Sequence, residues 1–132
     1  MDDLAYADIG DLARRLRCGD LSSVELTRRQ LERIGLLDGA LKAYALVLET
    51  AALEQAAAAD RELAAGRWRG PLHGVPLGVK DLLWLAGAPT AAGTIVHRGF
   101  RPAEDATIVR RLRAAGAVFL GKLQLTEGAY SD

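Results

Sequence analysis

The chain has 132 residues, of which 50% are apolar and 26% are charged, and its 17 basic and 17 acidic side chains cancel. This composition is typical of one folded domain, and the neutral balance gives no bulk field for direct binding of nucleic acid. The single cysteine excludes a disulfide framework. An acidic N-terminus and the lack of an apolar run near the ~18 residues of a membrane span predict a cytoplasmic protein without membrane contact.

The first half of the chain, residues 1–66, has the pattern of a mainly helical opening segment. Apolar residues recur at helical spacing over 9–16, and Gly19 ends that run. The next helix begins at Ser22, which has the spacing of a capping box with Glu25. We therefore expect two consecutive helices at the start of the chain.

A short strand and an alanine-rich helix follow. Residues 43–48 alternate weakly and are rich in strand-forming side chains, which favours a strand. Residues 50–65 are dominated by strong helix formers, and Gly66 is suited to the C-terminal cap. Charges interrupt the alanines, so we expect packing against a neighbour rather than a flexible tract.

The second half, residues 67–132, has the texture of an α/β protein. A strand over 75–79, a helix capped by Asp105 and ended by Gly116, and a strand over 117–123 predict a βαβ unit with parallel strands. The helix residues that we expect to face the core are Ile108, Val109 and Leu112. The fold class is thus α/β, with N-terminal helices followed by the first βαβ portion of a core sheet that is incomplete.

A long loop leaves the first of these strands. Some two dozen residues, dense in Gly, Pro and Thr, separate Asp81 from the helix start. Compact domains seldom keep loops beyond about 12–15 residues unless these bind or catalyse. The loop starts at the C-terminal end of a parallel strand, where open α/β sheets place ligand sites.

Lys80 ends this strand and is the candidate catalytic residue. Side chains alternate along a strand, so Pro76, Gly78 and Lys80 share a face that is nearly bare until the lysine. A partly desolvated amine beside a hydroxyl acts as a general base. The alternative is that Lys80 and Asp81 simply end a strand at the surface, paired with other charges, which spacing alone favours.

The motifs "GPLHGVPLGVKDLLWLAGAPTAAGT" and "DATIVRRLRAAGAVFLGKLQLTEGA" resemble the amidase-signature family of serine hydrolases. The resemblance runs from Gly70 to the end of the chain, and the N-terminal helices resemble that family's opening segment. It implies that residues 1–132 are the N-terminal part of a single amidase-signature domain whose C-terminal remainder is absent.

The resemblance also implies a mechanism. Family members cleave amides with a Ser–cis-Ser–Lys triad, in which the lysine that matches Lys80 deprotonates a serine on a cis peptide, which relays to the nucleophilic serine. The substrate of the whole enzyme is then a small-molecule amide, with no cofactor and no metal. Both family serines lie in a Gly/Ser-rich stretch that this sequence lacks, so we expect the chain alone to be inactive.

The serines that the chain has are Ser22, Ser23 and Ser131. The first two are explained by a helix start, and Ser131 is by position neither triad serine. The sequence predicts a backbone-bonding role for His73 and no metal site at His97. For Trp84, a role in packing is favoured over a role in covering a pocket. For Glu127, support of the site through hydrogen bonds and a role in a turn or helix cap are equally favoured.

Three functions fit the sequence. The first is an amidase-type hydrolase, with a homodimer as one assembly. The second, within the same family, is the glutamine-hydrolysing component of an amidotransferase, which releases ammonia for tRNA-linked amidation together with partner subunits. The third is a truncated remnant without catalysis. After Lys122 the family usually has Thr-Asn-Met where this chain has Leu123, Gln124 and Leu125, which weakens any assignment of substrate.

Overall fold

The computed structural model describes residues 3–130, so Ser131 lies outside the described residues. The helices and strands, in chain order, are the 3₁₀ helix Asp3–Ala5, α1 (Ile9–Cys18), α2 (Ser23–Leu41), β1 (Tyr44–Val47), α3 (Glu49–Ala64), β2 (Pro76–Lys80), α4 (Thr107–Ala114), β3 (Val118–Leu123) and the 3₁₀ helix Glu127–Ala129. Within this range, no helix is long and apolar enough to cross a membrane.

The strands of the described residues form one sheet in the order β1–β3–β2. β2 and β3 are parallel and joined through α4, which confirms the predicted βαβ unit and the α/β class. β1 pairs with the other edge of β3 and runs antiparallel to it. β3 therefore lies at the centre of the sheet, and its residues are almost all buried.

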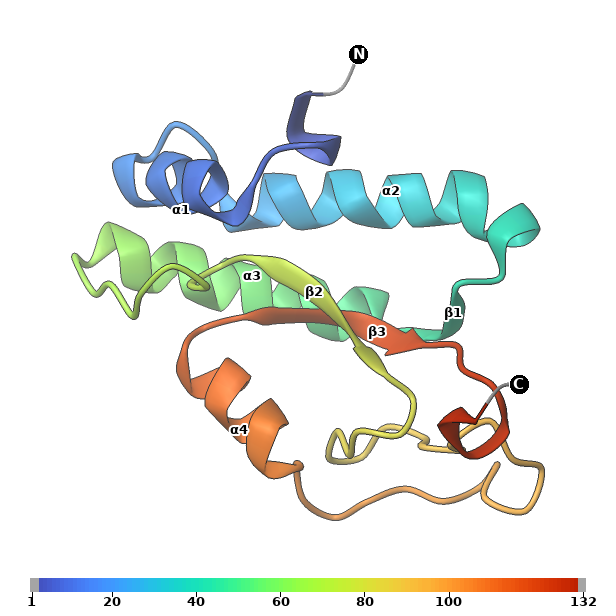
Figure 1. Ribbon diagram of the computed structural model, residues 1–132. Coiled ribbons are helices and arrows are strands. Elements are labelled where there is room, and N and C mark those ends of the chain that lie inside the picture. Colours follow the sequence, from blue (N-terminus) through green and yellow to red (C-terminus); the bar gives the residue numbers. More distant parts are fainter. Residues whose placement is uncertain (1–2, 131–132) are drawn as a thin grey trace.

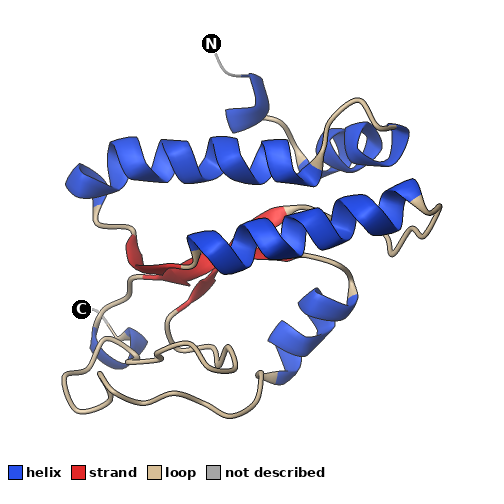
Figure 2. Ribbon diagram, turned by 180° about the vertical axis from the view of Figure 1, so that it is seen from behind, coloured by secondary structure: helices blue, strands red, loops and turns tan. Residues whose placement is uncertain are grey.

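Two layers of helix and loop cover the sheet (Figure 1). α2 and α3 lie on one face, where alanines of α3 pack closely against Val118 and Leu120 of β3. α4 and the long loop after β2 lie on the opposite side of the sheet, as the view from behind also shows (Figure 2). There Val109 of α4 packs with Val79 and Phe119 in a second apolar cluster.

The helix starts and stops confirm most of the sequence signals. Gly19, with φ of 79°, caps α1, and Ser22 Oγ accepts a hydrogen bond from the Glu25 backbone N–H at 3.0 Å at the start of α2. α3 is capped by Ala65, one residue before the expected Gly66, which follows in the left-handed region. Local chemistry alone thus locates these helix ends to within a residue.

The start of α4 differs from the prediction. Ala106 is the N-cap residue, and Asp105 instead accepts a hydrogen bond from the Ala86 N–H at 2.7 Å and pairs with Arg113 at 2.8 Å. Both oxygens of this carboxylate are already bound, by the loop N–H and by the Arg113 guanidinium, in place of the helix terminus. Of the residues expected to face the core, Val109 is fully buried and Ile108 is half exposed.

A bulge in β3 changes which side chains share a face. The pairing with β2 shifts between Phe119 and Gly121, so Leu120 is an extra residue. Strict alternation would send Phe119 and Lys122 to opposite faces, and the extra residue returns both to the face of the long loop. Gly121 is required there, since a Cβ at this position would meet the backbone carbonyl of Leu46.

Candidate functional site

Lys80 is the last residue of β2, and its side chain is exposed. It lies opposite Leu123 in the parallel pairing, so β2 and β3 end side by side. The Lys80 Nζ donates a hydrogen bond to the backbone carbonyl oxygen of Gln124 at 2.7 Å. The segment that follows β3 therefore holds the Lys80 amine at the edge of the sheet.

Lys80 lines an open hollow of about 620 Å³, which we call the Lys80 hollow. Lys42 and Ala43 line it from the turn before β1, and residues 123–126 and Ala129 line it from the chain after β3. The expected desolvation of Lys80 is not met, because the hollow is open. The expected bare face of β2 is also filled: a Cβ at Gly78 would lie 2.8 Å from the side chain of Leu123.

The residue after Lys80, Asp81, forms a buried ion pair with Lys122. Asp81 Oδ1 is 3.2 Å from Lys122 Nζ, and the two side chains are 6% and 0% exposed. Lys122 also donates to the Thr90 hydroxyl at 2.6 Å. Burial lowers the pKa of Lys122, and the Asp81 carboxylate opposes that shift. The sequence analysis gave Asp81 only a possible surface role and Lys122 none, so this pair is the part of the site that it missed.

The Asp81–Lys122 pair also forms hydrogen bonds with the long loop. Asp81 Oδ2 accepts a hydrogen bond from the Ala91 N–H at 3.1 Å, and its backbone carbonyl accepts from Ala92 N–H at 3.2 Å. Next to them, a Cβ at Gly93 would lie 2.7 Å from the carbonyl oxygen of Thr126, so this glycine permits the close approach of two backbones. The loop is thus attached to both strand ends around Lys80.

The remaining loop candidates lie around a different hollow. Trp84 and His97 line it together with Thr90, and the Trp84 ring packs against Phe100 with centroids 5.5 Å apart. Trp84 therefore packs, as predicted, but it is 43% exposed and also lines this hollow. Glu127 is exposed and begins the last 3₁₀ helix, which agrees with its turn interpretation.

No described serine lies beside Lys80. Ser22 caps α2, which confirms that a helix start explains it. Ser23 is the first residue of α2, but its Oγ donates to the Gly74 carbonyl at 2.7 Å, a contact with a distant segment that a helix start does not explain. Gly74 precedes β2 and Lys80 ends it, so Ser23 is about 20 Å away along the strand. Among residues 3–130, no three His, Cys, Asp or Glu side chains gather in a way that could hold a metal ion.

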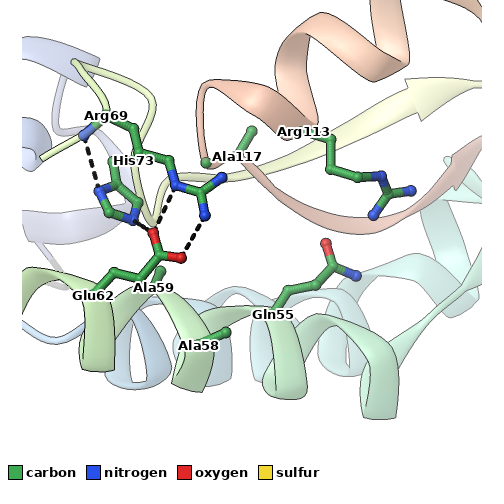
Figure 3. A pocket seen from close by; sticks show the side chains of 9 residues that line it. Gln55, Ala58, Ala59, Glu62, Arg69, His73, Arg113 and Ala117 are labelled. Atoms are coloured by element: carbon green, nitrogen blue, oxygen red, sulfur yellow. Dashed lines mark hydrogen bonds and ion pairs between the residues drawn. The ribbon is translucent and has the colours of Figure 1, made fainter. Parts of the chain in front are cut away.

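His73 belongs to a third hollow, of about 180 Å³, between α3 and the start of β3 (Figure 3). Its Nδ1 accepts a hydrogen bond from the Arg69 backbone N–H at 3.3 Å, as the sequence predicted. The Glu62 carboxylate lies between the His73 ring, at 3.2 Å from Nε2, and the Arg69 guanidinium (Figure 3). Both ring nitrogens are therefore occupied, so His73 serves the fold rather than proton transfer.

The environment of His73 predicts a pH dependence of stability. Burial holds the pKa of His73 below its usual 6.5, with Glu62 opposing. The unfolded chain therefore binds more protons than the folded chain. The contribution of neutral His73 to stability is complete above about pH 6.5 and is lost as the pH falls through the folded-state pKa. We expect urea unfolding to show a lower free energy of unfolding at about pH 5.5 than at about pH 7.5.

A matched control exists because the chain has two histidines. His73→Gln should remove the pH dependence between these two values, whereas His97→Gln, at an exposed position, should keep it. If both variants lost the pH dependence equally, this dependence could not be assigned to His73.

Comparison with known proteins gives one family throughout. A family model described as Amidase matches residues 25–132. A protein named as a putative amidase, AmiD of Mycobacterium tuberculosis (strain ATCC 25618 / H37Rv), is 53% identical over 129 residues, which are 98% of this chain and 27% of that protein. A glutamyl-tRNA(Gln) amidotransferase component of Salinispora arenicola (strain CNS-205) is 45% identical over 98% of this chain and 26% of its own length.

Solved structures agree. The native peptide amidase of Stenotrophomonas maltophilia superimposes with a TM-score of 0.87 and 47% identity, over 94% of this chain and 26% of that enzyme. The chain thus spans about a quarter of the length of the relatives that it matches.

Proposed function

The chain belongs to the amidase family, and from this premise we propose that Lys80 is the general base of an amide hydrolase whose two serines come from polypeptide outside these 132 residues. One observation carries the proposal: within the segment that matches the family, the Lys80 amine faces an open hollow and is bonded to a carbonyl oxygen, not to a carboxylate. Such an amine has room for a hydroxyl and no ion pair that fixes its charge.

The proposed reaction starts with the neutral Lys80 amine accepting a proton from a serine on a cis peptide. That serine takes the proton of the nucleophilic serine, whose oxygen attacks the amide carbon. The C–N bond breaks as the leaving amine receives the proton that Lys80 returns through the serine on the cis peptide, and an ester to the nucleophile remains. Water then hydrolyses the ester, releases the acid and restores the starting groups.

Amidotransferase chemistry is the second candidate, supported by the 45% identity to the Salinispora amidotransferase component. It uses the same amide hydrolysis, with glutamine as the amide and ammonia passed to a second reaction. Lys80 would have the same role in either case, and partner subunits would be needed in the second. Residues 123–125, which replace the usual Thr-Asn-Met, line the Lys80 hollow. Because this part of the wall differs from the family pattern, the proposal does not specify the acyl group of the substrate.

A chimera tests the proposal. The segment of the Stenotrophomonas peptide amidase that this chain matches is replaced by the chain, and hydrolysis of a peptide amide and of glutamine is followed by ammonia release. We expect turnover of at least one of these amides by the chimera and none by the 132-residue chain alone, because only the chimera contains serines that reach Lys80.

Two outcomes would contradict the proposal. One is a chimera that melts cooperatively, as the parent enzyme does, yet hydrolyses neither amide. The other is hydrolysis by the chain alone that Lys80→Ala abolishes, since a nucleophile would then lie within these residues.

A further inference from the structure

The Asp81 carboxylate is next to Lys80 in the chain, yet it is bound elsewhere. Lys80 extends into the open hollow toward Gln124, whereas Asp81 points into the protein, 3.2 Å from Lys122 Nζ. The second carboxylate oxygen accepts the Ala91 N–H. Both oxygens of Asp81 thus have a donor that is not Lys80.

This arrangement matters for a lysine that works as a base. A carboxylate close to an amine favours the protonated form, which cannot accept a further proton. Lys122 supplies a positive charge on the far side of Asp81, so the pair presents little net charge to Lys80. An apolar residue at position 122 would leave an uncompensated carboxylate one residue from the base.

We propose that Lys122 and Asp81 are positioning residues for Lys80: Lys122 neutralises the Asp81 carboxylate, so that Asp81 can anchor the loop at residues 90–92 without holding Lys80 in its charged form. The proposal rests on the proposed function of Lys80. It assigns Lys122 an effect on Lys80 without contact, through the charge of Asp81.

The other charged groups near the Lys80 hollow are Lys42, Asp38 and Glu127. Lys42 lines the same hollow and is a cation, not a carboxylate. Glu127 is exposed at the start of the last 3₁₀ helix, and its side chain is not among those that line the hollow. The Asp38 carboxylate accepts from the Ala43 N–H at 2.7 Å and is half-buried there, whereas Asp81 is buried and next to Lys80 in the chain. Of these described carboxylates, Asp81 is the buried one, and its charge is compensated by Lys122.

The test measures how much of Lys80 is neutral, since only a neutral amine is acylated. The purified chain is labelled at about pH 8 with a trace of an amine-acylating reagent, and acylation of Lys80 relative to Lys42 is measured by peptide mass spectrometry. The chain has three lysines, and Lys42 in the same hollow is an internal reference for access of the reagent.

We expect the Lys80/Lys42 ratio to fall about threefold in Lys122→Met, because an unpaired carboxylate beyond hydrogen-bond range has a smaller effect than the tenfold or more of a contacting one. In Asp81→Asn/Lys122→Met, which has neither charge, the ratio should return to the wild-type value. An unchanged ratio in Lys122→Met would overturn the proposal.

The double variant keeps the test decisive if the single variant does not fold. A ratio in the double variant more than about twofold above wild type would show that Asp81 already acts on Lys80 in the native chain, and the proposal would fail. Labelling requires no turnover, so the inference and the proposed function fail separately: an inactive chimera leaves the ratios unaffected.

Discussion

Lys80→Ala is expected to lower amide hydrolysis by the chimera by at least about 10³-fold, the range in which loss of a general base or triad member falls. The amine is the group that receives the first proton, and among the described side chains that line the Lys80 hollow, Lys42 is the one other amine. The loss should lie in kcat, with KM little changed, because the amine acts on the enzyme's own serine.

Two further variants separate base chemistry from charge and packing. Lys80→Arg keeps the positive charge but has no accessible neutral form, so we expect a loss similar to that of alanine. Lys42→Ala removes a lysine from the same hollow and should retain activity within a fewfold of the parent chimera. Substantial turnover by Lys80→Arg, or an equal loss in Lys42→Ala, would refute the assignment of Lys80.

The sequence was informative about elements whose signals are local. Ser22 caps α2 through its own hydroxyl, and Gly19 ends α1 in the left-handed region, so neighbours a few residues away decide both. The parallel strands followed from their apolar runs and the helix between them. The family resemblance came from the same segments, which is why it was correct before any tertiary contact was known.

Features that depend on distant partners were not predictable. Asp105 had the sequence context of an N-cap, but the loop N–H of Ala86 and the Arg113 guanidinium compete for its carboxylate. β1 was expected as a strand, yet its position beside β3 depends on pairing 74 or more residues away in the chain, as between Val47 and Gly121. Propensity carries no information on such pairings.

Lys122 was missed for a specific geometric reason. Alternation from the apolar Phe119 places residue 122 on the opposite face, and the bulge at Leu120 reverses this. One signal was present: a lone lysine within the buried strand "VFLGKL", parallel to a strand that is followed by Asp81. Buried charges are almost always paired, so the two residues could have been assigned to each other.

The Asp81–Lys122 pair should also dominate the stability of this end of the sheet. Lys122→Met or Asp81→Asn alone is expected to lower the free energy of unfolding by about 3 kcal/mol, because each leaves the other group buried without its partner. The double variant should lose much less than the sum, since it contains neither buried charge. Urea unfolding of the wild type, the two single variants and the double variant gives the coupling energy between the two residues, which we expect to reach about 2 kcal/mol or more.

An exposed ion pair provides the matched control. Arg29 and Glu25 of α2 are 2.8 Å apart with side chains 44% and 47% exposed. Solvent screens such pairs, so the cycle with Glu25→Gln and Arg29→Met should give a coupling of about 0.5 kcal/mol or less. If the Asp81–Lys122 cycle were no larger, the two charges would not depend on each other, and Lys122 could not be what compensates Asp81 beside Lys80. A large coupling with an unchanged labelling ratio would instead limit the pair to a structural role.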